Sequence, residues 1–355
     1  MQFPRKIGVL TFHRSINYGS YWQARCLVQG IRARGFDAKL LDYDCSAVRR
    51  AEIGCALQPE LPRRTPRASL KGYAAKVRRF DDAVSALPLS RRFQLNEPGN
   101  AGEYDAIVVG SDEVWNFRHP WFGSKPIFFG DELRADRLIS YAASFGNYTA
   151  WHGIHADWAR KLDRFSAVSV RDDNSWHLIK SGTGRDATLV LDPCLQFPQV
   201  AAGPGQSGAR QVVVYGHGFP AWLKTRIRGW ADRRGVRLVS TGYLNDWAHE
   251  QHLTAGPSEF AELMASAQAV VTNFFHGCVF ALVNGKPWVS SPSAYRSIKI
   301  PDLVSAVGAQ RRLIDEDTSQ RDIAELLETP VESEVVSRIE QLRAQSDAYL
   351  DAALS

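Results

Sequence analysis

Two basic residues in this sequence stand where a buried strand is expected to pass into a helix. Arg171 follows an apolar run and precedes the helix-starting residues 172–174, and His276 with Gly277 follows the apolar run 269–272. A guanidinium group is a planar fork that binds a carboxylate or phosphate through two hydrogen bonds. The first turn of a helix adds N–H groups and positive potential, and glycine permits close approach. The pattern predicts anion-binding positions, with a structural Arg–Asp pair and a capping histidine as the alternatives.

Other expected strand ends also carry polar residues and glycine. They are residues 17–20 (Asn-Tyr-Gly-Ser), 110–112 (Gly-Ser-Asp), 140–146 with Ser144, and 215–218 with Gly216 and His217. Each stretch is compatible with a ligand-binding loop or with an ordinary helix cap or turn. The sequence contains no GxSxG elbow, Walker loop, HExxH or GxGxxG motif.

The elements that position these loops follow from the pattern of the sequence. Short apolar runs alternate with helical patterns, which is typical of parallel sheets covered by helices on both faces. In the first half we predict strands at 7–12, 38–42, 106–110, 138–142, 167–170 and 188–191, and helices including 21–34 and 157–164. In the second half we predict strands at 211–215, 236–241, 269–272 and 287–290, and helices at 222–234, 257–266, 277–284 and 333–353.

The Gly/Pro/Ser-rich stretch 201–210 is typical of a linker, and 355 residues exceed one ordinary core. We therefore predict an α/β domain at 1–203, a second at 204–330, and a C-terminal helix at 331–355 that packs back on the body. Both domains are expected to hold doubly wound, Rossmann-like parallel sheets with a cleft between them. Ligands bind such sheets at the carboxyl ends of the strands.

Positive charge is concentrated in one segment, which we treat as an insertion in the first domain. Residues 49–92 contain eleven Lys or Arg and four acids, a net charge of +7, whereas the whole chain has +5. Such a segment attracts phosphate, acidic glycan or an anionic membrane face, and a solvated basic hairpin is the alternative. No recognition motif for nucleic acid accompanies the charge.

The remaining composition is that of an ordinary globular protein, with 45% apolar and 23% charged residues. Five cysteines without a metal-ligand spacing predict scattered thiols and no metal site. No apolar run reaches the roughly 18 residues of a membrane span. The N-terminal stretch resembles a first strand more than a signal peptide, so we expect a cytoplasmic protein.

The motifs, taken in order, resemble the polysaccharide pyruvyltransferase family. The matching pieces are IGVLTFHRSINYGSYWQA, YDAIVVGSDEVWN, SYAASFG, SVRDD, LDPC, VVTNFFHGCVFALVNGKPWV and YRSIKIPDLVSAVG, which span residues 7 to 308. The resemblance implies a two-domain GT-B-like fold and transfer of a pyruvyl group from phosphoenolpyruvate to a sugar of a polysaccharide or glycan precursor. A cyclic ketal forms, phosphate is released, and neither a metal nor an organic cofactor is implied.

In family terms Arg171 and His276 correspond to donor-binding positions. We expect Arg171 to clamp the carboxylate or phosphate and His276 to bind the donor and move protons, as histidine does near neutral pH. The other expected donor-binding residues are Asn273, Gly277, Cys278, Gly216, His217, Arg296 and Lys299. Of these, the N–H groups of Gly277 and Cys278 would complete the anion site, and Arg296 and Lys299 would neutralise the leaving phosphate.

The loops of the first domain are expected to hold the acceptor. The candidates are Asn17, Gly19, Ser111 and Ser144, with Asp112 as a catalytic base toward a sugar hydroxyl. One position departs from the family pattern: many members carry arginine two residues before the histidine, where this chain has Phe274. Arg296 or Lys299 would have to supply the missing charge.

Two other functions remain open on the same fold. One is a GT-B-type glycosyltransferase that uses a nucleotide sugar, and the other is a glycan- or anion-binding protein without catalysis. The expected partners are phosphoenolpyruvate and a sugar or lipid-linked glycan. Segment 49–92 could dock at the inner membrane face, and both a monomer and a homo-oligomer are compatible with the sequence.

Overall fold

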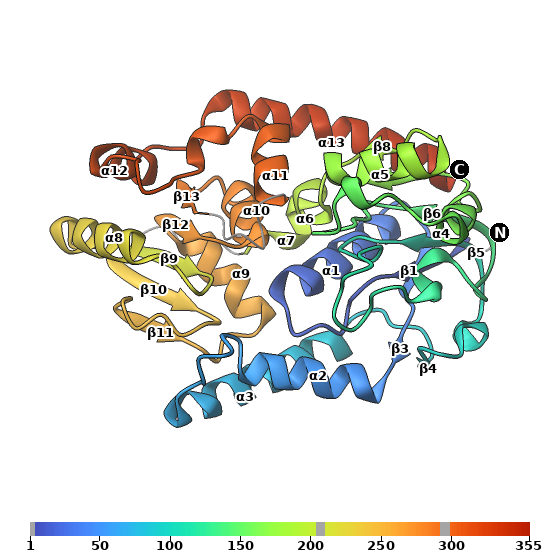
Figure 1. Cartoon of the computed structure of the whole chain (residues 1–355), viewed down its shortest axis with the longest axis horizontal. Coiled ribbons are helices and arrows are strands. Elements are labelled where there is room, and N and C mark those ends of the chain that lie inside the picture. Colours follow the sequence, from blue (N-terminus) through green and yellow to red (C-terminus); the bar gives the residue numbers. More distant parts are fainter. Residues whose placement is uncertain (1–3, 204–209, 292–298) are drawn as a thin grey trace. The chain divides into compact units, whose positions relative to one another are not determined.

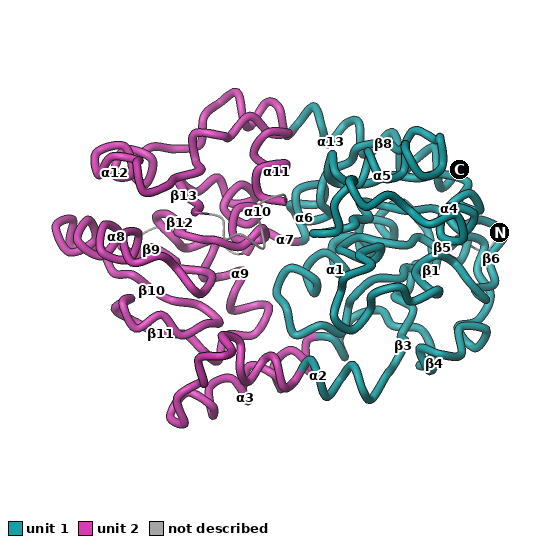
Figure 2. Tube along the Cα trace, in the orientation of Figure 1, with its two compact units in different colours: residues 1–52, 84–200, 340–355 teal, residues 53–83, 201–339 magenta. Residues whose placement is uncertain are grey.

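The computed structural model describes residues 4–203, 210–291 and 299–355, which fall into two compact units. Figure 1 labels the elements, and Figure 2 colours the units. Unit 1 contains residues 1–52, 84–200 and 340–355, and unit 2 contains residues 53–83 and 201–339.

Unit 1 is built on a parallel sheet with β1 and β5 as its central strands. The strand order is β2 (Asp37–Leu40), β1 (Lys6–Leu10), β5 (Glu103–Val109) and β6 (Arg134–Ser140). The chain leaves β1 through α1 (Tyr18–Arg32) to reach β2, and later returns to the opposite side of β1 at β5. The carboxyl ends of β1 and β5 therefore form a topological switch point, where doubly wound sheets bind ligands.

The remaining elements of unit 1 complete the layers around this sheet. An aromatic-rich core packs against one face, with Leu10, Ile107 and Val109 of the sheet beside Trp115 and Phe128. The other elements are β3 (Tyr43–Asp44), β4 (Phe93–Gln94), β7 (Ser169–Val170), β8 (Thr188–Leu189), α4 (Ala156–Leu162), α5 (Asp173–Thr183) and α6 (Pro193–Gln196), with 3-10 turns η1 (Pro98–Ala101), η2 (Pro126–Phe129) and η3 (Ala150–His152). Helix α2 (Ser46–Leu57) crosses the unit boundary after Glu52, and α7 (Pro198–Ala201) crosses it after Val200.

Unit 2 is built on a second parallel sheet, which also contains a topological switch point. Its order is β11 (Glu250–His252), β10 (Arg237–Thr241), β9 (Gln211–Tyr215), β12 (Ala269–Thr272) and β13 (Trp288–Ser290). The chain moves outward from β9 to β10 and returns to the other side of β9 at β12, so β9 and β12 form the switch point of this unit.

Helices cover both faces of the second sheet. Val212 and Val214 of β9 share a core with residues of α8 (Ala221–Arg234) and α12 (Gln320–Glu328). Because side chains alternate along a strand, Tyr215 points to the opposite face of the sheet. There its ring packs against Phe260 of α9 (Pro257–Ser266), with the ring centroids 4.8 Å apart. The other helical elements are α10 (Phe275–Val283), α11 (Lys299–Val307) and the 3-10 turn η5 (Gln310–Arg312).

The predicted alternation of strands and helices is confirmed in both units. The predicted strands 211–215 and 269–272 and the helix 257–266 have the predicted bounds, and the other predicted elements differ at their ends by a few residues. The helix predicted at 277–284 begins two residues earlier, at Phe275. Of the predicted linker 201–210, residues 204–209 lie outside the described residues.

The units differ from the predicted domains in the basic segment. Residues 53–83, assigned from sequence to the first domain, group with unit 2. The reason lies in α3 (Arg67–Ser85), which buries Tyr73, Lys76 and Phe80. The Tyr73 hydroxyl accepts a hydrogen bond from the Leu244 amide at 2.9 Å, and the Lys76 ammonium donates to the Gly242 carbonyl at 2.9 Å.

The C-terminal helix α13 (Ser333–Leu354), predicted to pack back on the body, is divided between the two units. Its residues up to 339 belong to unit 2, and those from 340 belong to unit 1. In unit 1 the Tyr349 hydroxyl donates to the Ser140 carbonyl at 2.7 Å, and the Ser346 hydroxyl accepts from the Leu191 amide at 2.9 Å. Neither α13 nor any other described helix is long and apolar enough to cross a lipid bilayer.

Lys76 allows a direct test of this packing. Its side chain is 2% exposed, and its ammonium lies 5.3 Å and 4.7 Å from the ring centroids of Tyr73 and Tyr243. Burial lowers the pKa of Lys76 from 10.5 to about 7. The unfolded chain therefore binds more protons than the folded protein between these values, and the stability contributed by Lys76 rises as pH rises above 7.

We expect the free energy of unfolding of the wild type, measured relative to Lys76→Met, to increase between pH 7 and 9. The slope should approach about 1.4 kcal/mol per pH unit at most. Urea denaturation of both proteins at several pH values measures the difference, and groups that titrate in both proteins cancel. Parallel pH profiles would show that Lys76 keeps an ordinary pKa and is not buried as described.

Candidate functional site

Arg171 lies at the switch point of unit 1, buried between two carboxylates. Its side chain is 3% exposed, with Nη2 3.5 Å from Asp112 Oδ1 and Nη1 3.3 Å from Asp192 Oδ2. Arg171 follows β7, Asp112 follows β5, and Asp192 precedes α6. We call Arg171, Asp112, Asp192 and the α1 residues that contact them, Ser20 and Gln23, the Arg171 cluster.

Asp112 has a strained backbone and a side chain that is held by several contacts. Its φ of 81° lies in the left-handed region, which residues other than glycine seldom adopt. Its Oδ2 accepts from the Ser20 hydroxyl at 2.6 Å, and its Oδ1 accepts from the Glu113 amide at 2.9 Å. The carboxylate thereby links the loop after β5 to helix α1.

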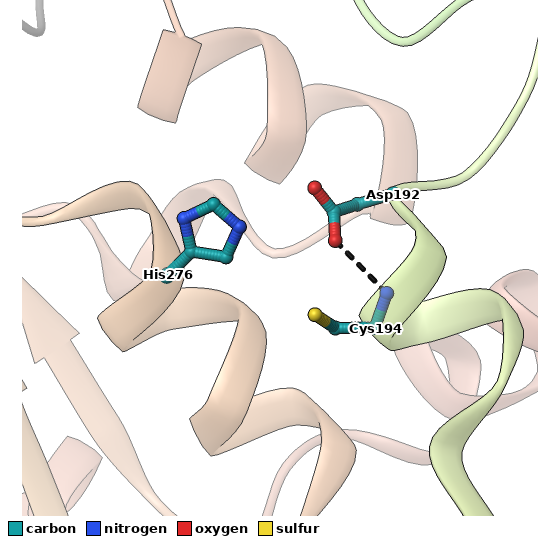
Figure 3. A group of neighbouring side chains, drawn as sticks. All are labelled: Asp192, Cys194 and His276. Atoms are coloured by element: carbon teal, nitrogen blue, oxygen red, sulfur yellow. Dashed lines mark hydrogen bonds between the residues drawn. The ribbon is translucent and has the colours of Figure 1, made fainter. Parts of the chain in front are cut away.

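Asp192 is a member of this cluster that the sequence prediction missed. It caps α6 by accepting from the Cys194 amide at 3.0 Å, the bond drawn in Figure 3, and it accepts from the Gln23 side chain at 2.5 Å. Burial raises the pKa of the Cys194 thiol, so Cys194 stays protonated. The sequence signal was available: an acid between the end of an apolar run and a proline that begins a helix.

The Arg171 cluster changes the expectation for the arginine. One guanidinium faces two carboxylates, so these groups together carry a net negative charge. An anionic donor that bound Arg171 would have to displace a carboxylate or share the guanidinium with it. The structural Arg–Asp pair, named as the alternative from sequence, is therefore present in unit 1.

The predicted acceptor-binding residues have mixed roles. Asn17 caps α1, accepting from the amides of Gly19 at 2.8 Å and Ser20 at 3.3 Å. The Ser144 hydroxyl donates to Asp172 at 2.6 Å and accepts from the Gly146 amide at 2.9 Å. These groups hold loops in place. Ser111 differs, because its buried hydroxyl has no hydrogen-bond partner among the described residues.

Glu52 is a second buried acid that sequence reasoning did not select. Its carboxylate accepts from the Ser15 hydroxyl at 2.7 Å and from the Ile16 amide at 2.9 Å, in the loop after β1. Burial raises its pKa. With Arg14 and Arg49 it lines a cavity of about 20 Å³, enough for roughly one water molecule. The spacing between residues 15 and 52 carries no sequence signal for this contact.

His276 lies in the first turn of α10, at the switch point of unit 2, and is labelled in Figure 3. Gly277, the next residue, packs against β12: a Cβ atom there would lie 2.0 Å from Thr272 Oγ1. The strand-to-helix turn predicted from sequence is therefore present. We call residues 272–277 with Gly216 and His217 the His276 corner.

The backbone amides of Gly277 and Cys278 already donate hydrogen bonds within the protein. Both donate to the Phe274 carbonyl, at 3.0 Å and 3.3 Å, because the helix begins at Phe275. The predicted anion site does not have these two N–H groups at its disposal. Burial raises the pKa of the Cys278 thiol to about 12, so this side chain also remains uncharged.

Asn273 joins the two loops of the unit 2 switch point. Its side-chain amide donates to the His217 carbonyl at 2.7 Å. Its Oδ1 is buried and has no hydrogen-bond partner within the described part of the chain. A Cβ atom at Gly216, whose φ is 144°, would lie 2.0 Å from that oxygen. Glycine is therefore required at 216, and the Asn273 oxygen could accept a ligand's hydrogen bond.

Phe274 is packed among aromatic rings. Its ring centroid lies 5.0 Å, 5.3 Å and 5.1 Å from the ring centroids of Tyr215, His217 and Tyr243. All three pairs are edge-to-face, an arrangement that aromatic pairs prefer. Lys299 begins α11 and is 9% exposed, and Arg296 lies outside the described residues.

A sequence profile of the polysaccharide pyruvyl transferase family matches residues 17–292. The chain belongs to the polysaccharide pyruvyl transferase family. This match covers the residues of the Arg171 cluster and of the His276 corner, and it confirms the resemblance seen in the motifs. A search of curated protein sequences found no match to this chain.

Solved structures with similar folds are far more distant in sequence. A UDP-N-acetylglucosamine 2-epimerase is 14% identical with a TM-score of 0.55, covering 100% of this chain and 96% of its own. The S. aureus MnaA–UDP co-structure is 10% identical, with a TM-score of 0.52 and coverages of 96% and 90%. A putative UDP-N-acetylglucosamine 2-epimerase from Listeria monocytogenes is 9% identical, with a TM-score of 0.51 and coverages of 97% and 91%.

These likenesses concern the fold alone. Together with the two parallel sheets and their switch points, they confirm the predicted class of two Rossmann-like, GT-B-type units. The catalytic, donor-binding and acceptor-binding roles assigned from the pyruvyl transferase resemblance remain predictions, as does the absence of a metal or organic cofactor.

Replacing Arg171 with methionine should destabilise the protein by roughly 3–5 kcal/mol, because Asp112 and Asp192 would be left buried without their cation. Urea unfolding measures the change. Arg134→Met is the matched control, since its ion pair with Glu103 is exposed and worth about 1 kcal/mol or less. Equal effects of the two substitutions would contradict the buried cluster.

Gly277→Ala should cost roughly 1–3 kcal/mol, because the new methyl group cannot fit against Thr272. Gly54→Ala is the control: it lies in α2 with no heavy atom within 4 Å of the added Cβ. This change should be neutral or stabilise the protein by about 0.5–1 kcal/mol. A Gly277→Ala protein as stable as Gly54→Ala would refute the close packing of α10 on β12.

Proposed function

We propose that this protein transfers the pyruvyl group of phosphoenolpyruvate to two hydroxyl groups of a glycan, forming a cyclic ketal and releasing phosphate. The observation that carries the proposal is the family match over residues 17–292. Phosphoenolpyruvate carries a carboxylate and a phosphate, so its site needs positive potential and a proton donor. His276 at the first turn of α10 offers both features in unit 2.

In the proposed reaction His276 protonates C3 of phosphoenolpyruvate, which makes C2 electrophilic. A sugar hydroxyl attacks C2, and the C2–O bond to phosphate then breaks. A second hydroxyl attacks the same carbon and closes the ketal. One hydroxyl proton replaces the proton that His276 gave to C3, and the other leaves with phosphate. Protons therefore balance, and no electrons are exchanged.

The Arg171 cluster is assigned to the acceptor in this proposal. The Asp112 carboxylate, held in place by Arg171, would accept a hydrogen bond from a sugar hydroxyl and take its proton. The strained backbone at Asp112 supports a functional role, since such strain gathers at ligand sites. We keep Lys299 and Arg296 as the proposed cations for the leaving phosphate.

Ligand-induced stabilisation separates this proposal from its rivals. Phosphoenolpyruvate should raise the melting temperature, by mass action on the folded state, and a panel of nucleotide sugars should not. Phosphate release in the presence of a glycan panel, followed by mass spectrometry of the product, then tests transfer. Stabilisation by a nucleotide sugar alone would favour a glycosyltransferase. Stabilisation by phosphoenolpyruvate with no phosphate release would favour a binding protein without catalysis.

Replacing His276 with glutamine tests the assigned proton transfer. We expect kcat to fall by about 10²- to 10⁴-fold, the usual contribution of a general acid, while the Kd for phosphoenolpyruvate changes only a few-fold. Phosphate-release kinetics and calorimetry measure the two quantities. His177→Gln is the control, because His177 is exposed on α5. An unchanged kcat for His276→Gln would remove His276 from the chemistry.

A further inference from the structure

Some basic residues of the segment 53–83 are buried or form ion pairs, and others are exposed without an ion pair among the described residues. Lys76 is buried, Arg79 pairs with Glu259 at 2.6 Å, and Arg63 lies 3.5 Å from Asp246. The other four are exposed and form no ion pair with any described residue: Arg64, Arg67, Lys71 and Arg78. Within this segment, positive charge that no described acid pairs with is therefore confined to these four side chains.

Three of these residues share one face of α3. Arg67, Lys71 and Arg78 are separated by four and seven residues, the spacing that stacks side chains along a helix. Tyr73, Val77 and Phe80 occupy the buried face of the same helix. The cations consequently lie on the side of α3 turned away from the body of unit 2, and Arg64 precedes them in the turn before the helix.

An exposed leucine accompanies this charge. Leu61, in the turn that leads into α3, is 66% exposed and precedes Pro62 and Arg63. Large apolar side chains with this exposure are few among the described residues. We call Leu61, Arg64, Arg67, Lys71 and Arg78 the α3 outer face.

We propose that the α3 outer face docks this protein on an anionic lipid bilayer. Basic side chains on one helical face are attracted to anionic headgroups, each worth about 1 kcal/mol near the surface. An adjacent leucine can enter the boundary between headgroups and acyl chains. A soluble acidic glycan would use the cations but would gain nothing from Leu61, so the apolar residue favours the bilayer. This inference does not depend on the proposed pyruvyl transfer.

Sedimentation with lipid vesicles tests the proposal on the full chain. Vesicles of phosphatidylcholine with about 30 mol% phosphatidylglycerol present the anionic surface, and phosphatidylcholine alone is the neutral reference. We expect binding to the anionic vesicles only, weakening as salt is raised. Arg67→Gln/Lys71→Gln should lower the partition coefficient by about 25-fold, or about fivefold per cation. Leu61→Asn should lower it by about three- to tenfold.

Arg233→Gln/Arg321→Gln is the matched control, because both residues are exposed and form no ion pair with a described residue of unit 2. It should bind like the wild type. Equal losses in the two double variants would reduce the effect to net charge and overturn the proposal. So would absence of vesicle binding, or equal binding to soluble polygalacturonate with no effect of Leu61→Asn. Phosphate release with a soluble glycan, measured separately, reports on the proposed function.

Discussion

The burial of the Arg171 guanidinium between two carboxylates is the constraint on which the switch point of unit 1 depends. A buried charge is tolerated only where opposite charges and hydrogen bonds replace water. Asp112 comes from the end of β5, and Asp192 comes from the turn before α6. Ser20 and Gln23 of α1 bind the same two carboxylates. Three loops and helix α1 can therefore take their positions only together, and a polar, precisely shaped edge of the sheet results.

The sheets themselves could be predicted from sequence because their signal is local. Continuous apolar runs alternating with helical patterns require parallel strands covered on both faces. The polar loops could be placed at strand ends for the same reason. Asp192 and Glu52 could not be assigned their contacts, because Arg171, Ser15 and their partners meet only after the chain has folded. Periodicity gives the elements, but it does not give the long-range pairs that neutralise buried charge.

A shift of two residues at one helix start had a larger effect on the predicted site than any error in the sheets. With the helix placed at 277–284, the Gly277 and Cys278 amides would be the unsatisfied first N–H groups. Because α10 begins at Phe275, these amides instead close onto the Phe274 carbonyl. Helix ends are poorly determined by sequence, since apolar residues such as Phe274 and Phe275 suit either the end of a strand or the first turn of a helix.

The aromatic packing of Phe274 gives a physical role to the residue that departs from the family pattern. Its ring is held by Tyr215, His217 and Tyr243, and the ammonium of Lys76 lies 4.7 Å from the Tyr243 centroid. A cation thus reaches the aromatic cluster from α3, a helix of the basic segment. The opposite face of that helix leaves its charges in solvent. One segment therefore serves two purposes: its buried face completes the packing beside the His276 corner, and its outer face remains available to a partner.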